Sequence, residues 1–258
     1  MGSASREALA AVRATLTPGL DAQSGAELLS AASQIGGSSA LLGALADNSA
    51  SDATKSQLIE RLFGAASAGA RQVLTAAVNQ SWSSADELVA GIEELGLRVE
   101  ALSEKNLADE LLAAAATIDS NHELELGLGS KLGDPAAKVA LVQKLFTGKL
   151  SVAAVGVVTH LVANPRGRRI SAALRESARV VADQGGSELA TVTVATALSD
   201  AQHGRIAALL EKSAGRPVRV TTVVDPSLVG GVRIQIGDDV IDGSVSSRLD
   251  DLRLQLAG

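Results

Sequence analysis

The segment DATKSQLIERLF at residues 52–63 returns as PAAKVALVQKLF at residues 135–146. In both, apolar residues recur three and four positions apart, which predicts two amphipathic helices. The second begins at Asp134-Pro135, a capping residue followed by proline at the first helical position. Identical or similar residues match at an offset of 83: Lys55 and Lys138, Leu58 and Leu141, Leu62 and Leu145, Phe63 and Phe146, Leu74 and Val157, and Val78 and Leu161.

Phe63 and Phe146 are the only phenylalanines in the chain, which makes their shared position in similar helices informative. Two amphipathic helices can look alike by chance. The match of Lys, Leu, Leu and Phe over nine positions nevertheless favours an internal duplication of a small helical domain.

Helical patterns continue through the first two thirds of the chain. Apolar residues at helical spacing alternate with stops at Pro18-Gly19 and Gly36-Gly37, and further helices are expected over 68–79 and 85–104. Two Phe, one Trp and no Tyr leave a core of Ala, Leu, Val and Ile, which suits closely packed helices. We predict a mainly α protein, an Ala/Leu-rich helical bundle that is duplicated.

The pattern changes after Gly185-Gly186. Residues 190–197 alternate Val and Thr, residues 218–224 are β-branched, and residues 232–236 alternate again before the turn Gly237-Asp238-Asp239, which leads into Val240-Ile241. Ser199 is expected to begin one helix and Ser244 a last one. The predicted division is therefore an extra helical module at 1–84, a helical bundle at 85–185 and a small α+β C-terminal domain at 186–258.

Composition excludes several classes of function. A net charge of −6, a pI near 5.2 and few aromatic residues argue against nucleic-acid binding, which uses basic faces and stacking rings. The absence of cysteine excludes disulfides and thiolate metal sites. We find no secretory signal and no run of about 20 apolar residues, so no direct membrane insertion is expected.

A dense set of turn residues lies near the C-terminus. VDPSLVGGVRI at 224–234 is followed by GDDVIDGSV at 237–245 and by Arg248, Leu249 and Leu252. This order closely resembles the C-terminal signature of the ATP synthase delta subunit family, to which the mitochondrial oligomycin-sensitivity-conferring protein belongs. Asn164-Pro165-Arg166 and Leu198-Ser199 also match the family's order. The resemblance covers about residue 85 to the end, while the first 84 residues look like an extra partial copy, as in some actinobacterial relatives.

The resemblance implies a non-catalytic peripheral-stalk (stator) subunit on the cytoplasmic face of the cell membrane. Its helical bundle would hold the N-terminal helices of the catalytic head's alpha subunits, and its C-terminal domain would hold the stalk b subunits. A free-standing adaptor that binds amphipathic helices is the alternative. The family-signature residues are expected to serve mainly as turns and caps: Asp225, Pro226, Gly230, Gly231, Asp242, Gly243, Ser244 and Arg248.

Candidate partner contacts are the apolar face of the last helix and an arginine cluster, which is interpreted either as a solvated end of the bundle or as a contact with an acidic partner segment: Val245, Leu249, Leu252, Arg166, Arg168 and Arg169. The sequence has no G-x-x-x-x-G-K-[ST] phosphate loop and no G-x-S-x-G elbow. His122, His160 and His203 lack metal-ligand spacing and are predicted to be surface or packing residues. We expect no catalytic residues, no cofactor and no metal.

Overall fold

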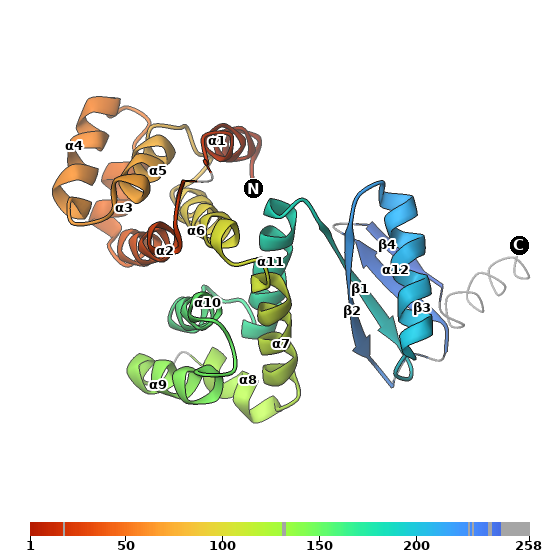
Figure 1. Cartoon of the computed structure of the whole chain (residues 1–258). Helices are drawn as coiled ribbons and strands as arrows, with labels where there is room; N and C mark the ends of the chain where they lie inside the picture. Colours follow the sequence, from red (N-terminus) through yellow and green to blue (C-terminus); the bar gives the residue numbers. More distant parts are fainter. Residues whose placement is uncertain (18, 131–132, 227, 229, 237–238, 244–258) are drawn as a thin grey trace, which may run out of the picture. The chain divides into compact units, whose positions relative to one another are not determined.

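The computed structural model describes residues 1–17, 19–130, 133–226, 228, 230–236 and 239–243. The chain forms two compact units, Met1–Val181 and a second that begins at Ala182. The first unit is helical and the second carries the sheet, which confirms the predicted fold class (Figure 1). The helices that precede the sheet are α1 (Ser3–Arg13), α2 (Ala22–Gly36), α3 (Ser39–Ala46), α4 (Asp52–Phe63), α5 (Ala68–Val78), α6 (Ala85–Ser103), α7 (Leu107–Asp119), α8 (His122–Gly129), α9 (Pro135–Phe146), α10 (Val152–Ala163) and α11 (Ile170–Gln184).

The duplication is visible in the burial of the side chains, above all in α2 and α7. Every buried residue of α2 has a buried counterpart 83 positions later in α7, including Leu28 with Leu111 and Ile35 with Ile118. The short helices α3 and α8 match at the same offset, with Leu45 and Leu128 fully buried. We call α1–α5 the first copy and α6–α10 the second copy.

The helices α4 and α9 also keep the offset of 83 and bury Phe63 and Phe146. In α5 and α10 the offset becomes 84, because the connection before α10 (147–151) is one residue longer than the connection before α5 (64–67). The capping residues Ser67 and Ser151 agree with the longer offset. Leu74 therefore corresponds to Val158 and Val78 to Val162, so the pairing predicted for this helix from the sequence was wrong by one residue.

The helix α6 closes the first copy and opens the second. Its residues Leu88, Ile92 and Leu95 belong to the core that α1–α5 enclose, and it contacts α1, α2, α3, α5 and α7. Most of its length is buried, including three charged residues, Glu93, Arg98 and Glu100. Burial on more than one side explains why its sequence lacks a clean polar stripe.

The second unit is a small sheet with one covering helix. It comprises β1 (Glu188–Val194), α12 (Asp200–Ala214), β2 (Val218–Val224), β3 (Val232–Ile236) and β4 (Asp239–Asp242), in the strand order β2-β1-β3-β4. β1 pairs in parallel with β2 and antiparallel with β3, and β4 pairs antiparallel with β3. Ala190, Val192 and Val194 of β1 form its core with Leu210 of α12.

Capping residues and glycines in the sequence mark the start and end of α12 and the end of α11. Ser199 and Gln202 form a capping box at the start of α12, and Gly215 ends it in the left-handed region. Gly186, with φ of +74°, ends α11: its N–H donates to the Asp183 carbonyl, and the Ser187 N–H donates to the Ala182 carbonyl. The strand expected at 190–197 runs from Glu188 to Val194, and the last helix expected after Ser244 lies outside the described residues.

Candidate functional site

The described signature residues gather around the end of β1 in the second unit. The Asp225 N–H donates to the Val194 carbonyl at 2.8 Å, Val232 pairs with Val194, and the Gly243 N–H donates to the Val232 carbonyl at 2.9 Å. Residues separated by almost fifty positions in the sequence thus hold one corner of the sheet. Their backbone contacts fit the structural role predicted for the signature.

The two adjacent glycines of the signature adopt backbone conformations that other residues rarely take. Gly230 and Gly231 have φ of +78° and +83°, so side chains there would be strained. Asp225-Pro226 follows the last residue of β2, as expected for a strand end. Ser244, Val245, Arg248, Leu249 and Leu252 lie outside the described residues, so their predicted roles stay predictions.

A cavity of about 470 Å³ lies beside this corner. Its walls come from the ends of three strands and from the turn after β2, and they combine apolar, hydroxyl and charged groups: Thr193, Val223, Val224, Asp225, Pro226, Leu228, Arg233 and Gln235. Val224 is about half exposed (49%). This mixed surface offers an apolar contact bordered by polar groups, which is the composition of a protein interface.

In the first unit, two of the three predicted arginines bind an internal partner. Arg166 and Arg168 form ion pairs with Glu93 of α6 at 3.1 and 2.9 Å. The Glu93 side chain is only 6% exposed, and its second oxygen also contacts His160 Nε2 at 3.0 Å. Burial would raise the pKa of Glu93, but the His160 hydrogen bond and the two arginine charges outweigh it and hold that pKa at about 2.

We call Glu93, His160, Arg166 and Arg168 the Glu93 cluster. Sequence reasoning found the arginines but missed Glu93, and it predicted His160 to be a surface or packing residue. His160 is buried, and it is the only ionisable residue in the otherwise apolar helix VAAVGVVTHLVA. A lone histidine in such a helix needs a partner once it is buried, and that signal could have led to an acidic residue on a neighbouring helix.

Arg169, the third arginine, is exposed. It lines a cavity of about 530 Å³ between the end of α8 and the start of α11, together with Glu125, Leu126, Gly129, Ser130, Pro165, Gly167 and Arg168. Leu126 is 58% exposed. An exposed leucine close to two arginines, one of them paired with Glu93, gives this surface an apolar and a charged part.

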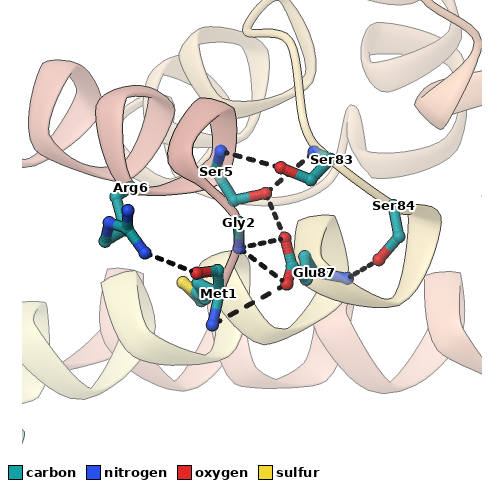
Figure 2. A network of polar contacts seen from close by, with 7 residues as sticks. All are labelled: Met1, Gly2, Ser5, Arg6, Ser83, Ser84 and Glu87. Carbon is teal, nitrogen blue, oxygen red and sulfur yellow. Dashed lines mark hydrogen bonds and ion pairs between the residues drawn. The ribbon is translucent and has the colours of Figure 1, made fainter.

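A second polar group ties the start of α1 to the start of α6 (Figure 2). The Glu87 carboxylate accepts hydrogen bonds from the Gly2 N–H at 3.0 Å and from the Ser5 hydroxyl at 2.5 Å. The Ser83 N–H donates to Ser5 Oγ at 2.9 Å. The hydrogen bond from Ser5 is the main cause that lowers the pKa of Glu87. These contacts fix the first helix of the first copy against the shared helix.

No group of three His, Cys, Asp or Glu side chains that could hold a metal occurs among the residues described. In the same part of the chain, no single helix has both the length and the apolarity to cross a membrane. Taken together, α2 and α3, bent by 106°, meet that criterion by length and composition.

The molecule combines a duplicated helical bundle with a small α+β unit that has glycine turns at one corner of its sheet. The family model described as ATP synthase delta (OSCP) subunit matches residues 97–256. The chain belongs to this family, as the resemblance of its C-terminal signature predicted. It is therefore a non-catalytic component of the ATP synthase complex.

Two bacterial relatives match this chain over its whole length. ATP synthase subunit delta of Leifsonia xyli subsp. xyli is 46% identical over 264 residues, covering all of both chains. The subunit of Streptomyces coelicolor is 35% identical and covers all of this chain and 98% of its own. A chain in the cryo-EM structure of the Toxoplasma gondii mitochondrial ATP synthase hexamer aligns over 60% of this chain and 88% of its own, with 23% identity and a TM-score of 0.38.

Both bacterial alignments span this entire chain and therefore include the first copy, which the family model leaves out. The first copy is thus shared with these actinobacterial relatives. Family membership also favours the stator subunit over the free-standing adaptor that the sequence left as an alternative.

Proposed function

We propose that this chain ties the catalytic head of the ATP synthase to its peripheral stalk at the cytoplasmic face of the cell membrane. In this proposal the bundle at 85–185 binds the N-terminal helices of the head's alpha subunits. The α+β domain at 186–258 binds the stalk b subunits, and residues 1–84 form an extra helical module. The observation that carries the proposal is the division of a family member into two compact units, each with its own core.

A tether of this kind has a clear physical purpose. The rotor applies torque to the head, and the head turns with it unless something anchored outside holds it still. Two binding modules joined in one chain hold better than either alone, because release of one leaves the other close to its partner at a high effective concentration. The chain passes from one unit to the other along α11, which ends before Gly186.

The proposal assigns each unit a candidate contact surface. On the bundle it is the cavity beside Arg169 and Leu126, which fits an amphipathic helix with acidic residues. Arg168 also lines this cavity, and its ion pair with Glu93 holds it in place. On the C-terminal domain it is the apolar side of the segment after β4, with Val245, Leu249 and Leu252.

Membranes stripped of this chain provide the test. They should hydrolyse ATP without pumping protons, and the purified full chain should restore ATP-driven pumping. A tagged chain should bring down alpha and b subunits from mild-detergent extracts. Failure of the chain to restore pumping, or capture of neither subunit, would contradict the proposal and favour a free-standing adaptor.

Two variants separate the surfaces. Arg169→Glu should weaken head binding about tenfold and leave stalk binding unchanged, since a reversed rim charge acts mainly on association. Leu249→Asp should abolish stalk binding and spare head binding. Arg61→Glu, on an exposed position of α4, is the matched control and should change neither. Loss of head binding in the control would mean that net charge, and not the Arg169 surface, decides the contact.

A further inference from the structure

The second helix of the first copy lies on the second copy. α2 contacts α6 and α10, the first and fifth helices of the second copy. The Ser33 hydroxyl of α2 donates to Asn164 Oδ1 at 2.8 Å, and Asn164 Nδ2 donates to the His160 carbonyl at 2.9 Å. One face of the second copy is thus already occupied by a helix of the same chain.

Small residues allow α2 to approach α6 closely. A Cβ atom on Gly96 of α6 would lie 3.0 Å from Leu29 Cδ2, and one on Gly36 of α2 would lie 3.2 Å from Val89 Cγ1. At Gly25 of α2 it would lie 2.7 Å from Glu100 Cγ. Contacts of this closeness on both helices mean that a larger side chain would push α2 away from α6.

Polar groups hold the edge of the contact where packing is incomplete. A cavity of about 420 Å³ lies between the end of α2 and the residues around Asn164 and Arg166. The hydrogen bond of Ser33 crosses this edge to Asn164. From there the contacts continue through His160 to Glu93 and the two arginines, so a connected polar network runs from the first copy to the shared helix.

The groups that the second copy contributes to this network are not repeated at the equivalent positions of the first copy. With the offset of 84 that applies to α5 and α10, His160 corresponds to Ala76 and Asn164 to Gln80. Ala76 and Gln80 are partly exposed. The polar groups on α10 are therefore features of the junction and not of the repeated fold.

We propose that α2 stays seated on α6 and α10 in the assembled enzyme. The first copy is then a built-in cover for this face of the second copy, and partner helices bind on other surfaces of the chain. The statement about assembly rests on the proposed stator function, while the seating of α2 is a property of the chain by itself.

Reversible cross-linking of residue 33 in α2 to residue 164 after α10 tests whether α2 stays seated during assembly. The chain has no cysteine, so Ser33→Cys with Asn164→Cys places the only two thiols where the present side chains touch. A short bis-methanethiosulfonate reagent joins the two thiols through mixed disulfides and dithiothreitol removes it. The joined protein should restore ATP-driven proton pumping to stripped membranes within twofold of the reduced protein. Each single-cysteine variant, treated in the same way, is the control.

A tenfold loss of restored pumping on cross-linking, recovered with dithiothreitol, would overturn the proposal, because α2 would then have to leave its place during assembly. If the unmodified wild-type chain also fails to restore pumping, the stator function fails instead. Hydrogen exchange in the purified wild-type and Ser33→Ala chains then tests whether α2 is seated on α6 and α10. Slow exchange in α2 and α10, increased in both by Ser33→Ala, supports it, and rapid exchange of α2 in the wild type contradicts it.

Discussion

The two copies share a scaffold but differ at their junction. In each, a glutamate in the second helix accepts a hydrogen bond from the N–H of the serine that caps the fifth helix: Glu27 from Ser67 at 2.8 Å and Glu110 from Ser151 at 3.0 Å. The leucine and isoleucine positions of α2 and α7 are equally buried. Contacts that hold one copy together have thus been kept in both.

The copies differ both in their interior contacts and at their junction. Lys55 is buried and donates to the Val78 carbonyl at 3.0 Å, whereas its counterpart Lys138 is partly exposed and donates to the Ser130 carbonyl instead. The second copy has the Glu93 cluster, and the first has Trp82 buried against Gly91. Repeated apolar positions therefore fix the core of each copy, while individual polar contacts have diverged, among them those at the junction.

The largest effect is expected from removing the phenylalanines that occupy equivalent positions in the two copies. Phe63→Ala and Phe146→Ala should each cost about 3–5 kcal/mol of unfolding free energy, because each leaves a cavity in a buried site. If the domain division proposed above holds, the effects should be nearly additive and local in urea unfolding and hydrogen exchange. Increased exchange over 130–180 as large as that over 40–80 in Phe63→Ala would show one cooperative bundle.

Two buried glutamates of α6 should respond to pH in opposite directions. The folded pKa of Glu93 is lowered to about 2, so its contribution to stability is present above pH 4.5 and is lost as pH falls toward 2. Burial raises the pKa of Glu100 to about 7, and its Oε2 atom has no hydrogen-bond partner among the described residues. The stability that its protonation contributes is present below pH 4.5 and is lost as pH rises through 7.

Gln substitutions measure both effects. Glu100→Gln should stabilise the chain by about 2–3 kcal/mol above pH 8 and make little difference below pH 5. Glu93→Gln should destabilise it by a similar amount above pH 5, with the difference vanishing toward pH 2. Urea unfolding at a series of pH values checks both. Parallel curves for the two variants would contradict the assignment of opposite shifts.

The packing of Trp82 against Gly91 in the first copy can be tested by a substitution at Gly91. A Cβ atom there would lie 2.1 Å from Trp82 Cη2, so Gly91→Ala should cost about 1–3 kcal/mol and shift the tryptophan emission to longer wavelength. Gly43→Ala, in α3, is the matched control because nothing lies within 4 Å of the added atom. It should stabilise the helix by about 0.5–1 kcal/mol. Equal destabilisation by both would mean that backbone effects, not contact with Trp82, decide the result.

The smallest expected effect concerns the contact that both copies retain. Glu27→Ala and Glu110→Ala should each cost about 1 kcal/mol, since each removes a hydrogen bond to the start of a helix. Thermal unfolding compares them directly. A difference of more than about 1 kcal/mol between the two variants would show that the repeated contact no longer has the same weight in both copies.

Much of this arrangement could be predicted from the sequence, because periodicity and capping are local signals. The helices of 52–63 and 135–146, the capping Ser199 and the positive φ of Gly230 and Gly231 all follow from them. The offset of 84 in the fifth helix was missed, because apolar residues match at either offset there and only the capping residues Ser67 and Ser151 distinguish the two.

Glu93 could not be predicted for a different reason. A helix that is buried on two sides has no polar face against which a buried charge stands out. The partners of Glu93 lie 67 to 75 positions away in the sequence, at His160 and Arg168. Only the tertiary fold brings His160 of α10 and Arg168, in the connection before α11, to Glu93 of α6.

Because α6 serves as the last helix of one copy and the first of the next, the bundle can grow by five helices at a time. Insertion of one more copy of the five helices would therefore lengthen the helical bundle by a fixed amount, as in helical solenoids. A synthase carrying such an elongated subunit would reveal how much distance between head and stalk the machine tolerates.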